Sequence, residues 1–191
     1  MDPAPRRLGS IFHCSRGVHG VPTKPLVVYY SYTGSTATIA SQVLGNIGGV
    51  ERRLVDCESR PGLRSYLSNR MGKLPRLTNP DYDVSSYDPI ILLTPIWYGY
   101  PTPAMNAFLA STKLRDKKVI VGLVGARENS RVPLSRIWSA AIARDAKYIE
   151  TTHLRGLPIR KEQPRPTDEQ LRAQALKVCE MYRGIIDVSS E

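Results

Sequence analysis

The stretch from residue 25 to residue 36, PLVVYYSYTGST, constrains the fold of this chain more than any other. Residues 26–30 are an uninterrupted apolar and aromatic run rich in β-branched side chains, which is typical of a strand buried on both faces of a parallel sheet. Residues 31–36 carry Ser or Thr at four of six positions around Gly34. Apolar side chains then recur at helical spacing from Ala40 to Ile47. The sequence therefore predicts a strand, a hydroxyl-rich turn and the N-terminus of a helix.

This turn is a predicted anion site. Its backbone N–H groups point outward, the helix dipole favours negative charge, and the hydroxyls add donors, so a phosphate monoester is the expected ligand. In that interpretation Gly34 needs a positive φ or a close backbone approach. The alternative is that the hydroxyls only cap the helix. The segment lacks the lysine of a Walker loop and the three glycines of a dinucleotide fingerprint.

The rest of the chain alternates between strand and helix patterns. Glu51 and Arg53 alternate with apolar residues in a second strand over 50–55, which suits a sheet edge. Thr102 is an expected N-cap, followed by Pro103 at the first helical position. Further strands are expected at 89–94, 118–124 and 147–154, and further helices at 134–142 and from a Thr167–Gln170 capping box to Gly184. The alternation predicts an α/β fold with about five parallel strands covered on both faces.

Ligands of such folds bind outside the carboxyl ends of the strands. Three loops of this chain end there, at residues 31–36, 95–100 and 125–129. The first suits a phosphate, and the second offers aromatic faces to a flat ring. The alternative for Trp97 and Tyr98 is that they close the end of the sheet as ordinary core. The connection over residues 57–86 has weak periodicity, and a connection of that length is usually functional or mobile.

These motifs resemble the flavodoxin-like family of FMN-binding flavodoxins and NAD(P)H:quinone oxidoreductases. The resemblance rests on VVYYSYTGST at 27–36, on Tyr87-Asp88 before a strand that ends in TPIWYG at 94–99, and on the Pro-rich entry to a helix ending in Phe108-Leu109. It implies a three-layer sandwich with a five-stranded parallel sheet in the order 2-1-3-4-5 and FMN as the cofactor. The implied domain covers residues 25–191, after a flexible N-terminal tail over 1–24.

The resemblance also implies which residues hold FMN. The phosphate would be bound by Ser31, Tyr32, Thr33, Gly34, Ser35 and Thr36. The isoalloxazine would lie along Pro95, Ile96, Trp97, Tyr98 and Gly99, with its far edge near Gly125, Ala126 and Arg127. Relatives commonly carry a Ser/Thr-Gly-Gly stretch at this last position, so the 125–129 loop departs from the pattern. No catalytic side chain and no metal ligand is expected, because the flavin carries the redox chemistry.

Charge and cysteine content limit the alternatives. The net charge is +10, but no run of Lys or Arg exceeds two residues, so a small anionic cofactor is favoured over nucleic acid. The three cysteines are scattered and the three histidines do not cluster, which indicates a reducing, cytoplasmic compartment without a structural metal. No apolar run is long enough to span a membrane.

Three functions remain open from the sequence. The first is an oxidoreductase that passes electrons from NAD(P)H through bound FMN to a quinone or similar acceptor, and relatives of this type often form homodimers. The second is a flavodoxin-type electron carrier that serves a redox protein; such carriers are typically acidic, and this chain is basic. The third is a flavodoxin-like domain that has lost FMN and acts in binding or regulation.

Overall fold

A computed structural model describes residues 24–56, 62, 67, 71, 73–78, 80–126, 139, 143–156 and 166–187. Most of the expected helix at 134–142, the tail up to residue 23 and most of 57–72 lie outside these residues. The elements follow one another as β1 (Leu26–Tyr30), α1 (Ser35–Ile47), β2 (Val50–Leu54), β3 (Ile90–Trp97), β4 (Tyr100–Pro101), α3 (Pro103–Ser111), β5 (Lys118–Gly125), β6 (Tyr148–Arg155) and α5 (Asp168–Asp187).

The long strands form a parallel sheet in the order β2-β1-β3-β5-β6, and the short β4 pairs antiparallel with β3. Numbered without β4, the five parallel strands have the order 2-1-3-4-5, so the predicted topology is confirmed. β2 is an edge strand, as its alternating charges indicated. β1 and β3 lie inside the sheet and are almost continuously apolar, because both of their faces are covered.

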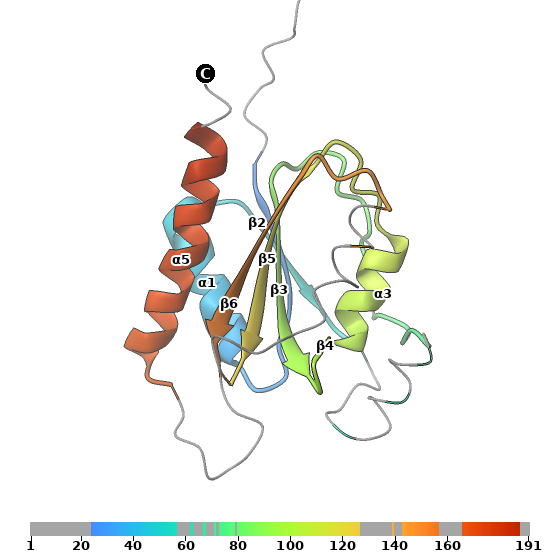
Figure 1. Cartoon of the computed structure of the whole chain (residues 1–191), viewed down its shortest axis with the longest axis horizontal. Helices are drawn as coiled ribbons and strands as arrows, with labels where there is room; N and C mark the ends of the chain where they lie inside the picture. The colour runs from blue at the N-terminus through green and yellow to red at the C-terminus, as the bar shows by residue number, and fades with distance from the viewer. Residues whose placement is uncertain are drawn as a thin grey trace, which may run out of the picture.

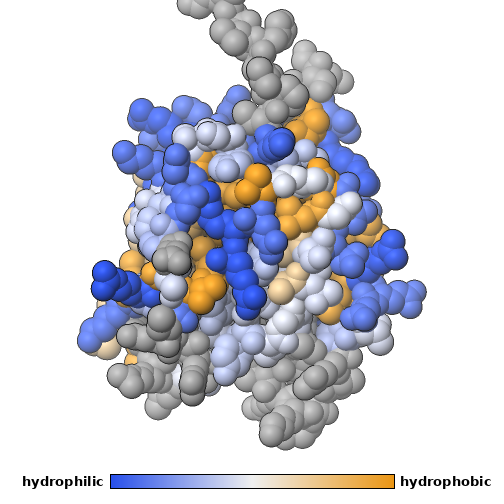
Figure 2. Space-filling view, turned by 180° about the vertical axis from the view of Figure 1, so that it is seen from behind, coloured by the Kyte–Doolittle hydropathy of each residue, from blue (hydrophilic) through white to orange (hydrophobic). Residues whose placement is uncertain are grey.

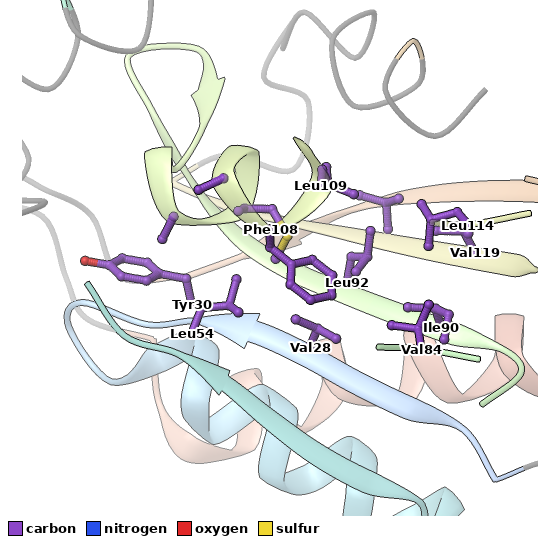
Figure 3. Close-up of a cluster of buried hydrophobic side chains, with 14 of the residues drawn as sticks. Val28, Tyr30, Leu54, Val84, Ile90, Leu92, Phe108, Leu109, Leu114 and Val119 are labelled. Atoms are coloured by element: carbon purple, nitrogen blue, oxygen red, sulfur yellow. The ribbon is translucent and has the colours of Figure 1, made fainter. Parts of the chain in front are cut away.

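Helices cover the sheet on both sides (Figure 1). α1 and α5 pack on one face, and α3 lies on the other. Between the sheet and α3 is a core in which Phe108, Leu92 and Val28 are fully buried (Figure 3). The opposite core holds Ile39, Val43 and Val178 between the sheet and the two helices α1 and α5. Apolar burial on both faces is the main stabilising term of such a sandwich.

The helix starts follow the sequence signals, and one helix end does not. The Thr102 side chain accepts from the Met105 N–H at 3.4 Å, which confirms the predicted N-cap of α3. Thr167 and Gln170 exchange hydrogen bonds of 3.0 and 3.2 Å, which confirms the capping box of α5. The prediction that Gly184 ends this helix was wrong. α5 continues to Asp187 because Ile185 still buries its side chain against the sheet.

None of the helices in the described parts of the chain is long and apolar enough to cross a membrane.

Candidate functional site

The turn between β1 and α1 has the backbone that an anion site requires. Gly34 is the N-cap of α1 and has a φ of 99°, a conformation that residues other than glycine rarely adopt. Its carbonyl accepts from the Thr38 N–H at 2.9 Å, which closes the first helical turn. No side chain caps the first turn of α1, and that turn contains no acidic residue. The N-cap position is therefore filled by a glycine, and none of the hydroxyl side chains of the turn serves as the N-cap of α1.

The hydroxyl side chains of this turn divide into buried and exposed ones. Ser35 and Thr36 are buried under the turn, and Tyr32 and Thr33 are exposed. The Oγ atom of Ser31 is inaccessible to solvent and has no hydrogen-bond partner among the residues described. A buried hydroxyl without a partner costs free energy, and such groups in native structures usually have a ligand or water as partner.

The second predicted loop is a β-hairpin. A Gly/Pro-bounded turn was expected over 95–100, but β3 extends to Trp97 and returns as β4. The hairpin turn consists of Tyr98 and Gly99, whose φ angles are 52° and 79°. Two successive positive φ angles are the geometry of the two-residue type I′ turn, whose twist matches that of the paired strands. Gly99 adopts a positive φ readily, whereas Tyr98 does so because the hairpin requires it. The Tyr98 side chain is 53% exposed.

Trp97 brings the first two loops together. It is 5% exposed and packs edge-on against Tyr30 and Tyr32, with ring centroids 5.7 and 5.8 Å apart. Tyr30 ends β1, and Tyr32 lies in the hydroxyl-rich turn with half of its surface exposed. The alternative that these two side chains close the end of the sheet as ordinary core is therefore correct for Trp97. It is wrong for Tyr98, which is exposed.

Two buried threonines hold the base of the hairpin. The Oγ1 atoms of Thr94 and Thr102 lie 3.1 Å apart, and the Thr102 N–H donates to Thr94 Oγ1 at 3.3 Å. Because Thr102 is also the N-cap of α3, this contact ties the end of β3 to the start of the helix. The sequence interpretation assigned the N-cap and missed the pair. The available signal was a threonine on each side of a short segment rich in Gly and Pro.

The third predicted loop adjoins the hairpin at the end of β5. Pro95 pairs in register with Val124, which places Gly125 and Ala126 next to the end of β3. The Gly125 carbonyl accepts from the Gly156 N–H at 2.6 Å, and Ala126 is exposed. Ile96 and Gly99 are half-buried in the hairpin. Arg127, the predicted cation at this edge, lies outside the described residues.

No cluster of three or more His, Cys, Asp or Glu side chains that could hold a metal ion occurs in the described part of the chain. The geometry thus combines a helix N-terminus with hydroxyls, an aromatic hairpin beside it, and the end of a neighbouring strand. It suits an anionic ligand with a flat ring.

Known proteins resemble this chain in structure. No protein-family model matches it, and no curated protein matches its sequence. A provisionally assigned flavoprotein from Bacteroides uniformis superposes with a TM-score of 0.60 at 20% identity, covering 80% of this chain and 97% of that one. A Lactobacillus acidophilus flavoprotein in complex with FMN has a TM-score of 0.52 at 22% identity, covering 70% and 92%. The Trp repressor binding protein of Bacillus subtilis has a TM-score of 0.55 at 18% identity, covering 81% and 99%.

This chain has a flavodoxin-like fold. In this fold the strand order reverses between β1 and β3, and the turn after β1 and the hairpin after β3 lie at that switch point. The contact between Tyr32 and Trp97 joins the two segments there.

Proposed function

We propose that this protein binds FMN at the carboxyl edge of its sheet and acts as an FMN-dependent oxidoreductase. The observation that carries the proposal is the junction of the Ser31–Thr36 turn with the Tyr98–Gly99 hairpin at the β1/β3 switch point. Flavodoxin-like sheets bind FMN at this point. The comparison with a solved FMN complex of the same fold supports the choice of ligand.

The turn after β1 fits the FMN phosphate. The uncapped first turn of α1 supplies N–H donors, and the partnerless Ser31 Oγ and the exposed Thr33 supply hydroxyl donors. A hydrogen bond to a charged group contributes roughly 1.5–3 kcal/mol. Several such bonds together account for specific recognition of a phosphate monoester.

The hairpin fits the isoalloxazine ring. Tyr98 and Tyr32 present exposed aromatic surface on the two sides of the switch point, and an offset-stacked ring adds about 1 kcal/mol beyond its buried area. Trp97 packs edge-on against Tyr32 and, because it is buried, offers little exposed surface to the ring. The backbone at Gly125 and Ala126 lies where the far edge of the ring would be placed.

Bound FMN would supply the redox chemistry, accepting electrons from a nicotinamide donor and passing them to an acceptor. The protein's own residues hold the phosphate, orient the ring and limit water access. The proposed donor is NAD(P)H and the proposed acceptor is a quinone or similar flat molecule stacked over the ring. Homodimerisation belongs to the same proposal.

The test is a visible absorption spectrum of the purified protein after incubation with FMN and desalting, followed by anaerobic addition of NADPH and of NADH. A retained flavin spectrum that bleaches with a nicotinamide supports the oxidoreductase. Retained flavin that bleaches only with dithionite favours the electron carrier. Folded protein that retains no flavin rejects the proposal and favours the domain that has lost FMN.

A further inference from the structure

The edge strand β2 carries two consecutive arginines on opposite faces. Successive side chains of a strand alternate, and Leu54 packs in the core beneath α3, so Arg52 shares that face. Glu51 and Arg53 therefore lie on the face that α1 covers. The hydrogen bond from the Tyr29 hydroxyl to Glu51 agrees, because Tyr29 belongs to the core under α1.

The interactions of the two arginines differ. Arg52 forms an ion pair with Asp81, donates to the Asp83 carbonyl at 3.0 Å, and lies 5.7 Å from the centroid of the Tyr87 ring. Arg53 is exposed and makes no hydrogen bond or ion pair within the described residues. A guanidinium that is exposed and has no partner among the described residues is available to an anion.

Arg53 lies next to the turn that carries the proposed phosphate site. It pairs in register with Tyr29 of β1, and Ser31 follows Tyr29 by two residues, directly after the end of that strand. Burial and, to a smaller extent, the hydrogen bond to Glu51 raise the pKa of Tyr29 to about 12, and the positive charge of Arg53 opposes this rise. The charge of Arg53 therefore acts on the residues that lead into the turn.

Figure 2 looks at the molecule from behind the view of Figure 1 and shows hydrophilic side chains beside smaller hydrophobic areas, without one continuous apolar face. The donors within the turn are uncharged, since they are hydroxyl and N–H groups. A phosphate monoester is close to dianionic at neutral pH, so a nearby cation has a charge to neutralise.

We propose that Arg53 pairs with the phosphate of the ligand bound at the Ser31–Thr36 turn and makes this protein select a phosphorylated flavin over an unphosphorylated one. This inference rests on the proposed function, because it presupposes that FMN binds at that turn. Arg53 is a specificity residue here and takes no part in electron transfer.

The experiment compares FMN with riboflavin, which lacks the phosphate. Dissociation constants for both are measured by quenching of flavin fluorescence for the wild type, Arg53→Gln, Arg53→Lys and Arg183→Gln. Arg183 is the matched control, because it is an exposed arginine near the far end of α5 and its loss changes the net charge equally. Thermal melting of each variant without flavin verifies folding.

The expected result is that Arg53→Gln weakens FMN binding about fivefold and leaves riboflavin binding unchanged, as for a partly exposed ion pair. Arg53→Lys retains most of the affinity, and Arg183→Gln matches the wild type. The affinity of the wild type for FMN falls more steeply with added salt than that of Arg53→Gln.

Equal loss of FMN and riboflavin binding in Arg53→Gln would show a general structural effect and overturn the inference. Unchanged FMN binding would overturn it too, while leaving the proposed function intact. A wild type that binds neither flavin would reject the proposed function itself, and this inference with it. These failures are distinguishable in one data set.

Discussion

The amino and carboxyl ends of the parallel strands form two opposite edges of the sheet. These two edges differ in how side chains of the protein bind the neighbouring helix ends. At the amino edge, Arg144 donates to the Ala110 carbonyl at 2.7 Å, and Lys118 donates to the Ile185 carbonyl at 3.4 Å. These carbonyls lie at the C-terminal ends of α3 and α5, whose last turns contain no basic residue. Cations from the segments entering β5 and β6 thus complement the negative ends of both helices.

At the carboxyl edge the described residues show no such side-chain contact to the N-terminal end of α1. The first turn of α1 has no side-chain cap, the Ser31 hydroxyl has no partner among the described residues, and Tyr98 is exposed in a strained conformation. At the amino edge, cations of the protein itself satisfy the two helix ends. In the proposed function, the N-terminus of α1 and the Ser31 hydroxyl at the carboxyl edge contact the ligand instead. Mutations at the two edges should therefore separate stability from flavin binding.

The largest expected effect is that of Trp97→Ala, which should lower the free energy of unfolding by about 3–5 kcal/mol. Trp97 is buried between Tyr30 and Tyr32, so its removal leaves a cavity at the end of the sheet. Urea denaturation of the flavin-free protein measures this. A loss below about 1 kcal/mol would mean that Trp97 is a wall of the ligand site and no part of the core.

Ser31→Ala should weaken FMN binding by roughly 1.5–3 kcal/mol without lowering the stability of the flavin-free protein. Its Oγ atom has no hydrogen-bond partner to lose within the described structure, but it would donate to the phosphate. Isothermal titration with FMN and a melting curve test the two halves separately. Ser111→Ala, at the exposed end of α3, is the control. Loss of stability with unchanged FMN affinity would contradict the phosphate assignment.

Arg144→Met should reduce the free energy of unfolding by about 0.3–1 kcal/mol and leave FMN affinity unchanged. The substitution removes the donor to the Ala110 carbonyl at the end of α3. Lys113→Met provides the comparison, since Lys113 is exposed just beyond the same helix and makes no hydrogen bond or ion pair within the described residues. If both variants lose equal stability, net charge rather than the contact with the helix end is responsible.

The smallest effect has the opposite sign. Tyr98→Gly should raise the free energy of unfolding by about 0.5 kcal/mol, because glycine relieves the left-handed conformation at a smaller entropic cost. FMN affinity should fall at the same time, since the exposed ring is lost. Chemical denaturation and FMN titration of the same preparation decide the matter. A destabilised variant would show that the contacts of the Tyr98 side chain with the protein outweigh the strain of its left-handed backbone.

The β1–α1 unit was predictable because its determinants are neighbours in the sequence. The apolar run of 26–30 requires burial on both faces, and the hydroxyls and Gly34 that follow suit a turn into a helix. The edge position of β2 was likewise visible in its alternating charges. The caps at Thr102 and Thr167 are also local, since each bonds within its own helical turn.

Other features depend on segments that are distant in the chain. Arg52 and Arg53 are adjacent in sequence, yet within the described residues only Arg52 is paired, because Asp81 lies on its face of β2. Ile185 carries α5 past Gly184 because the sheet offers it an apolar surface. The partner of Arg52 and the surface that buries Ile185 both lie far away in the chain. Local sequence patterns therefore gave no reason to expect different environments for the two arginines, or a longer α5.

The sequence by itself determined the alternation of strands and helices and the hydroxyl-rich turn with Gly34 after the first strand, because these follow from local periodicity and from residue types with strong backbone preferences. Only the tertiary structure decided the roles of Trp97 and Tyr98. The pairing of β3 with β4 turns one ring into the core against Tyr30 and exposes its neighbour at the hairpin tip. Both side chains are aromatic and adjacent in sequence, and pairing across the hairpin gives them opposite environments.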